Sequence, residues 1–228
     1  MFEFRFYEIW RSAEYVDRLI DGLINSRVLS TIGGICGFVM GLGLAIGQGR
    51  QGVPFPVKLA CVSYVEFVRN TPFIVQLFFV AFALPLLVGY QWSFEASALL
   101  AMTLNFSAYF AEVIRAGIDG VPRAQIEAFK SLGMTRRQGF FRVQLPQALA
   151  SVYPSLTSQY IFLFLTTGLI SEIGVRDLTW AGRFVADRTF RDFEVFIVLT
   201  LLYMASVYVF RLCFALIERR AFAWNVSR

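Results

Sequence analysis

Long apolar stretches alternate with short polar ones along this chain. Residues 28–49 contain no charged side chain, and four further apolar stretches cover residues 59–88, 95–116, 148–170 and 195–217. A helix needs about 20 mostly apolar residues to cross the hydrocarbon core of a bilayer. The pattern therefore predicts an all-α integral membrane protein with about five transmembrane helices.

Several residues predict details within these spans. Pro72 and Pro85 predict kinks or boundaries in the second span. Glu66 and Arg69 are three residues apart and are predicted to pair on one helix face. In the first span, glycines recur at four-residue spacing and predict close approach of another helix. These glycines are Gly33, Gly37 and Gly41.

The segments outside the spans suggest a division of the chain. Apolar residues at helical spacing between positions 6 and 20 predict an amphipathic helix that lies in the membrane surface. The acidic start argues against a cleaved signal peptide. We therefore expect an interfacial segment (1–27), a transmembrane domain (28–217) and a polar tail (218–228). Between the last two spans, residues 172–194 are expected to form a mixed-charge loop.

Composition narrows the functional classes. Of the 228 residues, 57% are hydrophobic and only 16% are charged, too few to cover a water-soluble globule. The net charge of +5 is spread between spans, which argues against nucleic-acid binding. Histidine is absent, so the commonest metal ligand and general base is missing. Cys36, Cys61 and Cys213 are far apart and are interpreted as small hydrophobic residues. We expect neither a metal site nor a catalytic centre.

The distribution of basic residues predicts the orientation in the membrane. With five spans, the two termini lie on opposite sides. Placing the segment after the third span in the cytoplasm puts 13 basic residues inside and 8 outside. Because basic residues favour the cytoplasmic side, we expect an external N-terminus and a cytoplasmic C-terminus in an inner membrane.

The connection formed by residues 117–146 is unusually long and has helix punctuation of its own. Pro122 suits a first helical turn, and residues 125–132 predict a short helix that Gly133 closes in the left-handed conformation. Thr135 and Gln138 are spaced as a capping box and predict a second short helix, which Pro146 is expected to end. Two ordered helices on one loop indicate a docking surface.

Several motifs in this order resemble a known family. Glu127-Ala128-Phe129, followed by Gly133 and by Val143-Gln144-Leu145-Pro146, resembles the EAA signature of bacterial ATP-binding-cassette (ABC) importer permeases, with Phe129 in place of the usual Ala. Three more stretches of the chain resemble the polar-amino-acid branch of these MetI-like, type I permeases. These are the stretches 64–77 (YVEFVRNTPFIVQL), 108–115 (AYFAEVIR) and 146–148 (PQA) with Pro154.

The resemblance implies that the long loop carries the coupling helix, which docks in a groove of an ATPase subunit. Small residues there would allow close backbone approach, and basic ones would pair with an acidic rim. The alternative is a solvated loop with no partner. The expected coupling residues are Gln125, Glu127, Ala128, Lys130, Gly133, Arg136, Arg137, Leu145 and Pro146.

The resemblance also implies partners. It predicts a second permease subunit (identical or different), two ATPase subunits, an external solute-binding protein and the surrounding lipid. Neither lysine of this chain follows a glycine, so neither can complete a phosphate-binding Gly-Lys-Ser/Thr loop. ATP and Mg²⁺ are therefore expected on the ATPase, with no cofactor in this chain.

Polar residues within spans are candidates for a solute pathway. Two alternatives stay open: Glu112 can form an internal pair with Arg115, and the amide and hydroxyl groups can bond to neighbouring backbone. Where the branch carries Lys-Asp-Thr-Ser-Leu, this chain has Leu165-Thr166-Thr167-Gly168-Leu169, so we expect no high-affinity site there. The candidates are Gln76, Asn105, Tyr109, Glu112, Gln159, Thr166 and Thr167.

The predicted function is therefore the permease subunit of an ABC importer for an amino acid or a similar polar solute. A stand-alone secondary transporter or channel is the main alternative, but no inverted repeat is evident in five spans. A membrane-embedded enzyme is disfavoured by the missing histidine and by the lack of a nucleophile cluster.

Overall fold

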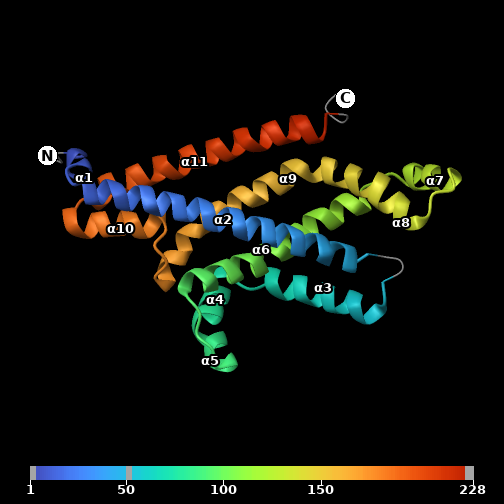
Figure 1. Ribbon diagram of the computed structural model, residues 1–228, viewed down its shortest axis with the longest axis horizontal. Coiled ribbons are helices and arrows are strands. Elements are labelled where there is room, and N and C mark those ends of the chain that lie inside the picture. The colour runs from blue at the N-terminus through green and yellow to red at the C-terminus, as the bar shows by residue number, and fades with distance from the viewer. Residues whose placement is uncertain (1–3, 50–52, 224–228) are drawn as a thin grey trace. The chain divides into compact units, whose positions relative to one another are not determined.

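The computed structural model describes residues 4–49 and 53–223, which are almost entirely helical and contain no strand (Figure 1). Within these residues, helices that are long and apolar enough to cross a membrane are α2 (Ala13–Gly47), α6 (Phe94–Asp119), the continuous helix Arg136–Ile173 and α11 (Asp192–Ala221). The helices α3 (Phe55–Arg69) and Phe73–Val88 together qualify as a fifth, broken span. The predicted all-α fold with about five spans is confirmed.

Shorter elements complete the chain. Two π-helical segments and one 3-10 segment (Thr167–Ile173) interrupt or extend the long helices. The remaining elements are α1 (Tyr7–Trp10), α4 (Phe73–Phe78), the π segment Phe79–Ala83, α5 (Leu84–Val88), α7 (Arg123–Ser131), α8 (Arg136–Gly139), the π segment Phe140–Gln144, α9 (Leu145–Thr166) and α10 (Leu178–Thr189).

The residues fall into two compact units, and the long helices contribute residues to both. Unit 1 comprises Met1–Ile35, Thr71–Thr103 and Ile161–Arg211. Unit 2 comprises Cys36–Asn70, Leu104–Tyr160 and Leu212–Arg228. The predicted coupling residues all belong to unit 2, whereas α10 belongs to unit 1.

Unit 1 is built around α10, where the sequence predicted only a loop. Figure 1 shows α1 and α10 beside the first turns of α2. The apolar residues of α10 recur at helical spacing, which gives it one buried face. This face joins the following core cluster: Ile9, Leu19, Leu178, Ala181, Val185, Ala186, Val195 and Leu199.

Unit 2 packs its helices through small residues and a few polar contacts. A Cβ atom on Gly41 would lie 2.8 Å from the Phe110 Cβ atom and from the Ser107 carbonyl oxygen, so α2 approaches α6 as the glycine spacing predicted. The Tyr64 hydroxyl donates to the Leu104 carbonyl oxygen (2.9 Å), which ties α3 to α6. Such contacts matter because lipid offers no hydrophobic drive for helices to associate.

Helix ends differ from the sequence predictions at the start of the chain. Helix α2 begins at Ala13, so residues 13–27 continue directly into the first span rather than forming a separate helix. The separate helix α1 is only 4 residues long. That the N-terminal segment lies in the membrane surface stays a prediction.

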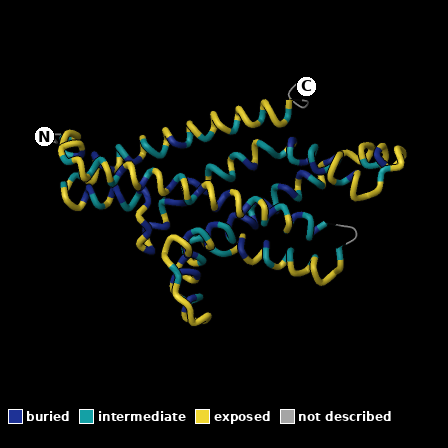
Figure 2. Tube along the Cα trace, in the orientation of Figure 1, coloured by how far each residue is buried: buried dark blue, intermediate teal, exposed yellow. Residues whose placement is uncertain are grey.

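Many residues of the long helices are exposed (Figure 2), and a large number of these exposed side chains are apolar. On α11, for example, the exposed fractions are 52% for Leu201, 61% for Met204 and 65% for Tyr208. In water such a surface would favour aggregation, whereas in a membrane it contacts lipid tails. The fold is therefore that of a membrane-embedded helical protein.

Candidate functional site

The loop after α6 folds into two short helices with the predicted punctuation. Helix α7 follows Pro122, and Gly133 has a φ of +69°, the left-handed conformation that favours glycine. The backbone N–H of Gln138 donates to the Thr135 hydroxyl (3.3 Å), and the backbone N–H of Thr135 donates to the side-chain oxygen of Gln138 (2.9 Å). The predicted capping box is thus present at the start of α8.

A contact between Phe129 and Gly139 holds α7 against α8. Phe129 is only 5% exposed. A Cβ atom on Gly139 would lie 2.3 Å from its ring, so the ring packs directly on the glycine backbone. This explains the departure from the EAA signature, because Phe129 is the internal anchor of the loop rather than part of its surface.

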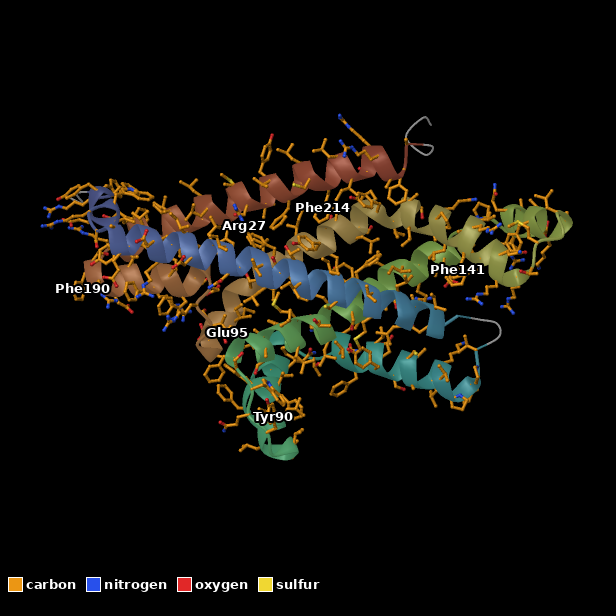
Figure 3. All side chains as sticks on the ribbon, viewed as in Figure 1. Arg27, Tyr90, Glu95, Phe141, Phe190 and Phe214 are labelled. Carbon is orange, nitrogen blue, oxygen red and sulfur yellow. The ribbon has the colours of Figure 1, made fainter. Side chains whose placement is uncertain are left out.

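Most of the other predicted loop residues are exposed. Two apolar side chains that the sequence analysis did not select are exposed on the same loop: Leu132 is 79% exposed, and Phe141, which Figure 3 labels, is 50% exposed. Leu145 is buried in the first turn of α9 and does not contribute to the exposed surface. The exposed predicted residues are Gln125, Glu127, Ala128, Lys130, Gly133, Arg136 and Arg137.

Pro146 does not end the second loop helix, contrary to the sequence prediction. Helical structure continues from Arg136 to Ile173. The π-helical segment Phe140–Gln144 immediately precedes the proline, and Pro146 itself lies in the first turn of α9. An irregular turn at this point accommodates a residue that lacks an amide hydrogen. The α7–α8 loop is therefore joined to the fourth span by continuous helical structure.

A charged network in unit 2 connects α3 and α6. The Glu112 carboxylate forms an ion pair with the Arg115 guanidinium and lies 3.6 Å from that of Arg69. Arg115 also contacts Asp119 at 2.9 Å. The predicted Glu66–Arg69 pair is therefore wrong: Arg69 reaches across to α6, and Glu66 accepts a hydrogen bond from the Asn70 side chain instead (3.3 Å).

Arg69 is a candidate site residue that the sequence analysis did not select. Its guanidinium also lies 5.9 Å from the centre of the Tyr109 ring. The network therefore brings together two predicted pathway residues, Tyr109 and Glu112. The motif that contains Arg69 was visible in the sequence, but its partner on another helix was not.

Most of the other pathway candidates are engaged locally. The Gln76 side-chain nitrogen donates to the Thr71 hydroxyl at 2.6 Å. The hydroxyls of Thr166 and Thr167 donate to carbonyl oxygens one turn earlier, of Phe162 (2.8 Å) and Phe164 (2.7 Å). These three residues belong to unit 1, so they are not part of the Glu112 network.

Two amide candidates lie in unit 2. Asn105 is buried, with 3% of its surface exposed. The Gln159 side-chain nitrogen is buried and has no hydrogen-bond partner among the described residues. A buried donor left without an acceptor is costly, so Gln159 is an unsatisfied polar group inside unit 2.

A buried polar cluster in unit 1 was missed by the sequence analysis. Asp177 is fully buried and caps α10 by accepting a hydrogen bond from the Trp180 amide nitrogen (2.8 Å). The Tyr203 hydroxyl contacts both Asp177 (3.4 Å) and Thr179 (2.9 Å), and Ser26 accepts from the Leu178 amide (3.0 Å). The signal was an aspartate directly before an apolar helical repeat.

Metal and redox chemistry find no support in the described ranges. They contain no cluster of three or more His, Cys, Asp or Glu residues able to hold a metal ion. Cys36, Cys61 and Cys213 are free thiols. The charged, amide and hydroxyl side chains described above can form hydrogen bonds and ion pairs that bind and orient a partner.

Together, the spans and the exposed two-helix loop define a multi-pass membrane protein. The sequence matches, over residues 33–223, the family described as binding-protein-dependent transport system inner membrane component. The chain belongs to this family and is the permease subunit of an ABC importer in an inner membrane. It is a transport subunit rather than an enzyme, since in this family the ATPase is a separate subunit.

Individual relatives agree with this assignment. The chain is 33% identical to the L-cystine transport system permease protein TcyL of Bacillus subtilis over 91% of this chain and 88% of the relative. It is 38% identical to the probable amino-acid ABC transporter permease protein PatM of Vibrio harveyi over 64% of this chain and 66% of that protein. A crystal structure of an amino acid ABC transporter with histidines superposes with a TM-score of 0.85 at 32% identity, covering 96% and 100% of the two chains.

Proposed function

We propose that this permease moves an amino acid, or a similar polar solute, inward across the membrane, and that the α7–α8 loop is its ATPase docking surface. The observation that carries the proposal is the exposed surface of this loop, which displays Glu127 and Lys130 on α7 and Gly133 in the turn after it, with α7 held against α8 by Phe129. The amino-acid solute is supported by the similarity to amino-acid permeases.

The working assembly would contain two permease subunits, two ATPase subunits that bind ATP and Mg²⁺, and an external solute-binding protein. The loop would lie in the cytoplasm, the N-terminus outside and the C-terminus inside. The count of basic residues supports this orientation, although Arg50 and Arg228, both counted as internal, lie outside the described residues. Closure of the ATPase pair on ATP would drive the spans between inward-open and outward-open forms.

The solute pathway would involve the Glu112 network and Gln159, without a high-affinity site at Thr166 and Thr167. Both threonine hydroxyls already donate to their own helix, which leaves them weak partners for a charged solute. Selectivity would then lie with the external binding protein and with a second permease subunit, where that subunit differs.

Reconstitution tests the proposal. The permease should co-purify with an ATPase, and liposomes containing the complex should accumulate a radiolabelled L-amino acid only when ATP and the loaded binding protein are both supplied. The matched control is the same complex with the catalytic glutamate of the ATPase replaced by glutamine. Uptake by the permease alone, driven by a proton or sodium gradient, would instead establish a secondary transporter.

A further inference from the structure

Two aromatic rings on α10 lie between two arginines, one in the segment that leads into the helix and one in its last turn. Arg176, Trp180, Phe184 and Arg188 follow one another at four-residue spacing. The Arg176 guanidinium lies 5.5 Å from the centre of the Trp180 ring, the Trp180 and Phe184 rings stack at 5.4 Å, and the Arg188 guanidinium lies 3.5 Å from the Phe184 ring. We call these four residues the α10 ladder.

The arginines at the two ends of the ladder differ from Arg183 in their ion pairing. Arg183, on the same helix, forms an ion pair with Glu172 at 2.5 Å. Neither Arg176 nor Arg188 forms an ion pair with a carboxylate of the described residues, and both are exposed. A guanidinium that stacks flat on a ring keeps its N–H edges available for a planar acceptor such as a carboxylate.

Helix α2 extends this surface at the Arg176 end. A cavity of about 190 Å³ is lined by Arg18, Asp21, Asn25, Arg176 and Trp180 among others. Arg18 also lies 5.2 Å from the Phe184 ring. Asp21 lines this cavity and Asp187 directly precedes Arg188 on α10, so the surface carries carboxylates as well as guanidinium groups. Recognition here would therefore depend on positioned guanidinium groups rather than on net charge.

The position of the ladder in the chain indicates its partner. One candidate span, α9 with its extensions, separates α10 from the α7–α8 loop in the sequence, so with the loop docked on the ATPase the ladder would lie on the opposite side of the membrane. Tryptophan and arginine beside a concave surface are the residues that most often dominate protein interfaces. The family is defined by dependence on a binding protein.

We infer that the α10 ladder is a docking surface for the external solute-binding protein, with Arg176 and Arg188 each receiving a carboxylate side chain of that partner. The inference rests on the proposed function. The two arginines lie twelve positions apart in the sequence and at opposite ends of the ladder, so the partner should present two separate acidic side chains rather than one.

The test uses the complete permease–ATPase complex in nanodiscs. The probe is the binding protein encoded beside the permease, loaded with the L-amino acid that stabilises it most against heat. In the double variant Arg176→Gln/Arg188→Gln, the concentration of binding protein that half-maximally stimulates ATP hydrolysis should rise at least tenfold, while unstimulated hydrolysis stays within twofold. In the control Arg183→Gln, the half-maximal concentration should change less than threefold.

Three results would overturn the inference. The first is an unchanged half-maximal concentration in the double variant. The second is an altered unstimulated activity that depends on anionic lipid in the nanodisc, which would make the membrane the partner. The third is the absence of any stimulation of the wild-type complex, which would contradict the proposed function as well. Should the double variant fail to assemble, Arg188→Cys in a chain without its native cysteines should cross-link to the loaded binding protein, and no cross-link would also overturn the inference.

Discussion

At the scale of single residues, two glycines with the same backbone conformation allow an effect of backbone strain to be distinguished from an effect on ATPase docking. Gly133 and Gly89 have φ values of +69° and +71°, and a Cβ atom at either position would meet nothing within 4 Å. A side chain at either position therefore costs about 1 kcal/mol of backbone strain and no steric clash. Only Gly133 lies on the α7–α8 loop.

The first prediction uses this pair. Gly133→Asp should abolish co-purification of the ATPase, or leave ATP hydrolysis unresponsive to the loaded binding protein, while membrane insertion survives. Gly89→Asp carries the same strain and should retain at least half of the wild-type assembly. Assembly and stimulated hydrolysis are measured on both variants in parallel. Equal losses would attribute the effect to strain rather than to docking.

The second residue prediction concerns Thr166 and Thr167. Thr166→Val and Thr167→Val should each change uptake less than threefold, because each removes only a neutral hydrogen bond to the same helix, worth about 0.5 kcal/mol. Initial rates of radiolabelled uptake give the measurement. A loss above tenfold, with solute bound against either threonine, would show that the fourth span holds a substrate site.

At the scale of elements, α10 depends on a buried carboxylate at its first turn. Burial raises the pKa of Asp177 from 3.8 to about 6, against the lowering effect of hydrogen bonds from the Trp180 backbone and the Tyr203 hydroxyl. The folded protein therefore holds this proton more tightly than the unfolded chain does. The resulting stability is fully present below pH 3.8 and is lost as the pH rises through about 6.

The corresponding prediction compares Asp177 with its isostere. Asp177→Asn keeps an oxygen to cap α10 but cannot titrate. The wild-type protein should unfold at a higher temperature at pH 5 than at pH 7.5, and this difference should shrink in Asp177→Asn. Thermal unfolding in detergent at the two pH values gives the comparison. An equal pH dependence in both proteins would assign it to other groups.

Elements also show how far the sequence could predict this structure. Long apolar runs are sufficient to locate spans, because a bilayer demands a fixed apolar length. The loop helices were predictable because Gly133 and the Thr135 capping box are local signals. Helix α10 was missed because a 12-residue amphipathic helix between two spans looks like a charged loop when only charge is considered.

Only the contiguous part of the candidate site was predictable from the sequence. The loop residues are contiguous, so their exposure follows from local folding. The Arg69–Glu112 contact joins residues 43 positions apart, and Arg69 could have paired with its helix neighbour Glu66 instead. Likewise, Phe129 was recognised as a departure from the signature, but its role requires Gly139, which only the folded loop brings beneath the ring.

At the scale of the whole molecule, the orientation in the membrane can be tested directly. In a chain whose three cysteines are replaced by alanine, Ser12→Cys should react with an impermeant thiol reagent in intact cells. Ser131→Cys, exposed on α7, should react only after the cells are opened. Ser227, a further suitable internal position, lies outside the described residues. The reverse labelling pattern would contradict an external N-terminus.

The continuous helix from Arg136 to Ile173 gives the importer a mechanical element. Its 38 residues include the π-helical turn Phe140–Gln144, Pro154 inside α9 and the 3-10 segment Thr167–Ile173, so it is not a uniform α-helix. In the proposed assembly, a push from the ATPase on the α7–α8 loop would pass directly into the fourth span, because no non-helical linker lies between them. Bending would then be concentrated at the three irregular positions, which divide the span into short stiff pieces. The movement of the gate would depend on how these pieces bend against one another as well as on the movement of the ATPase.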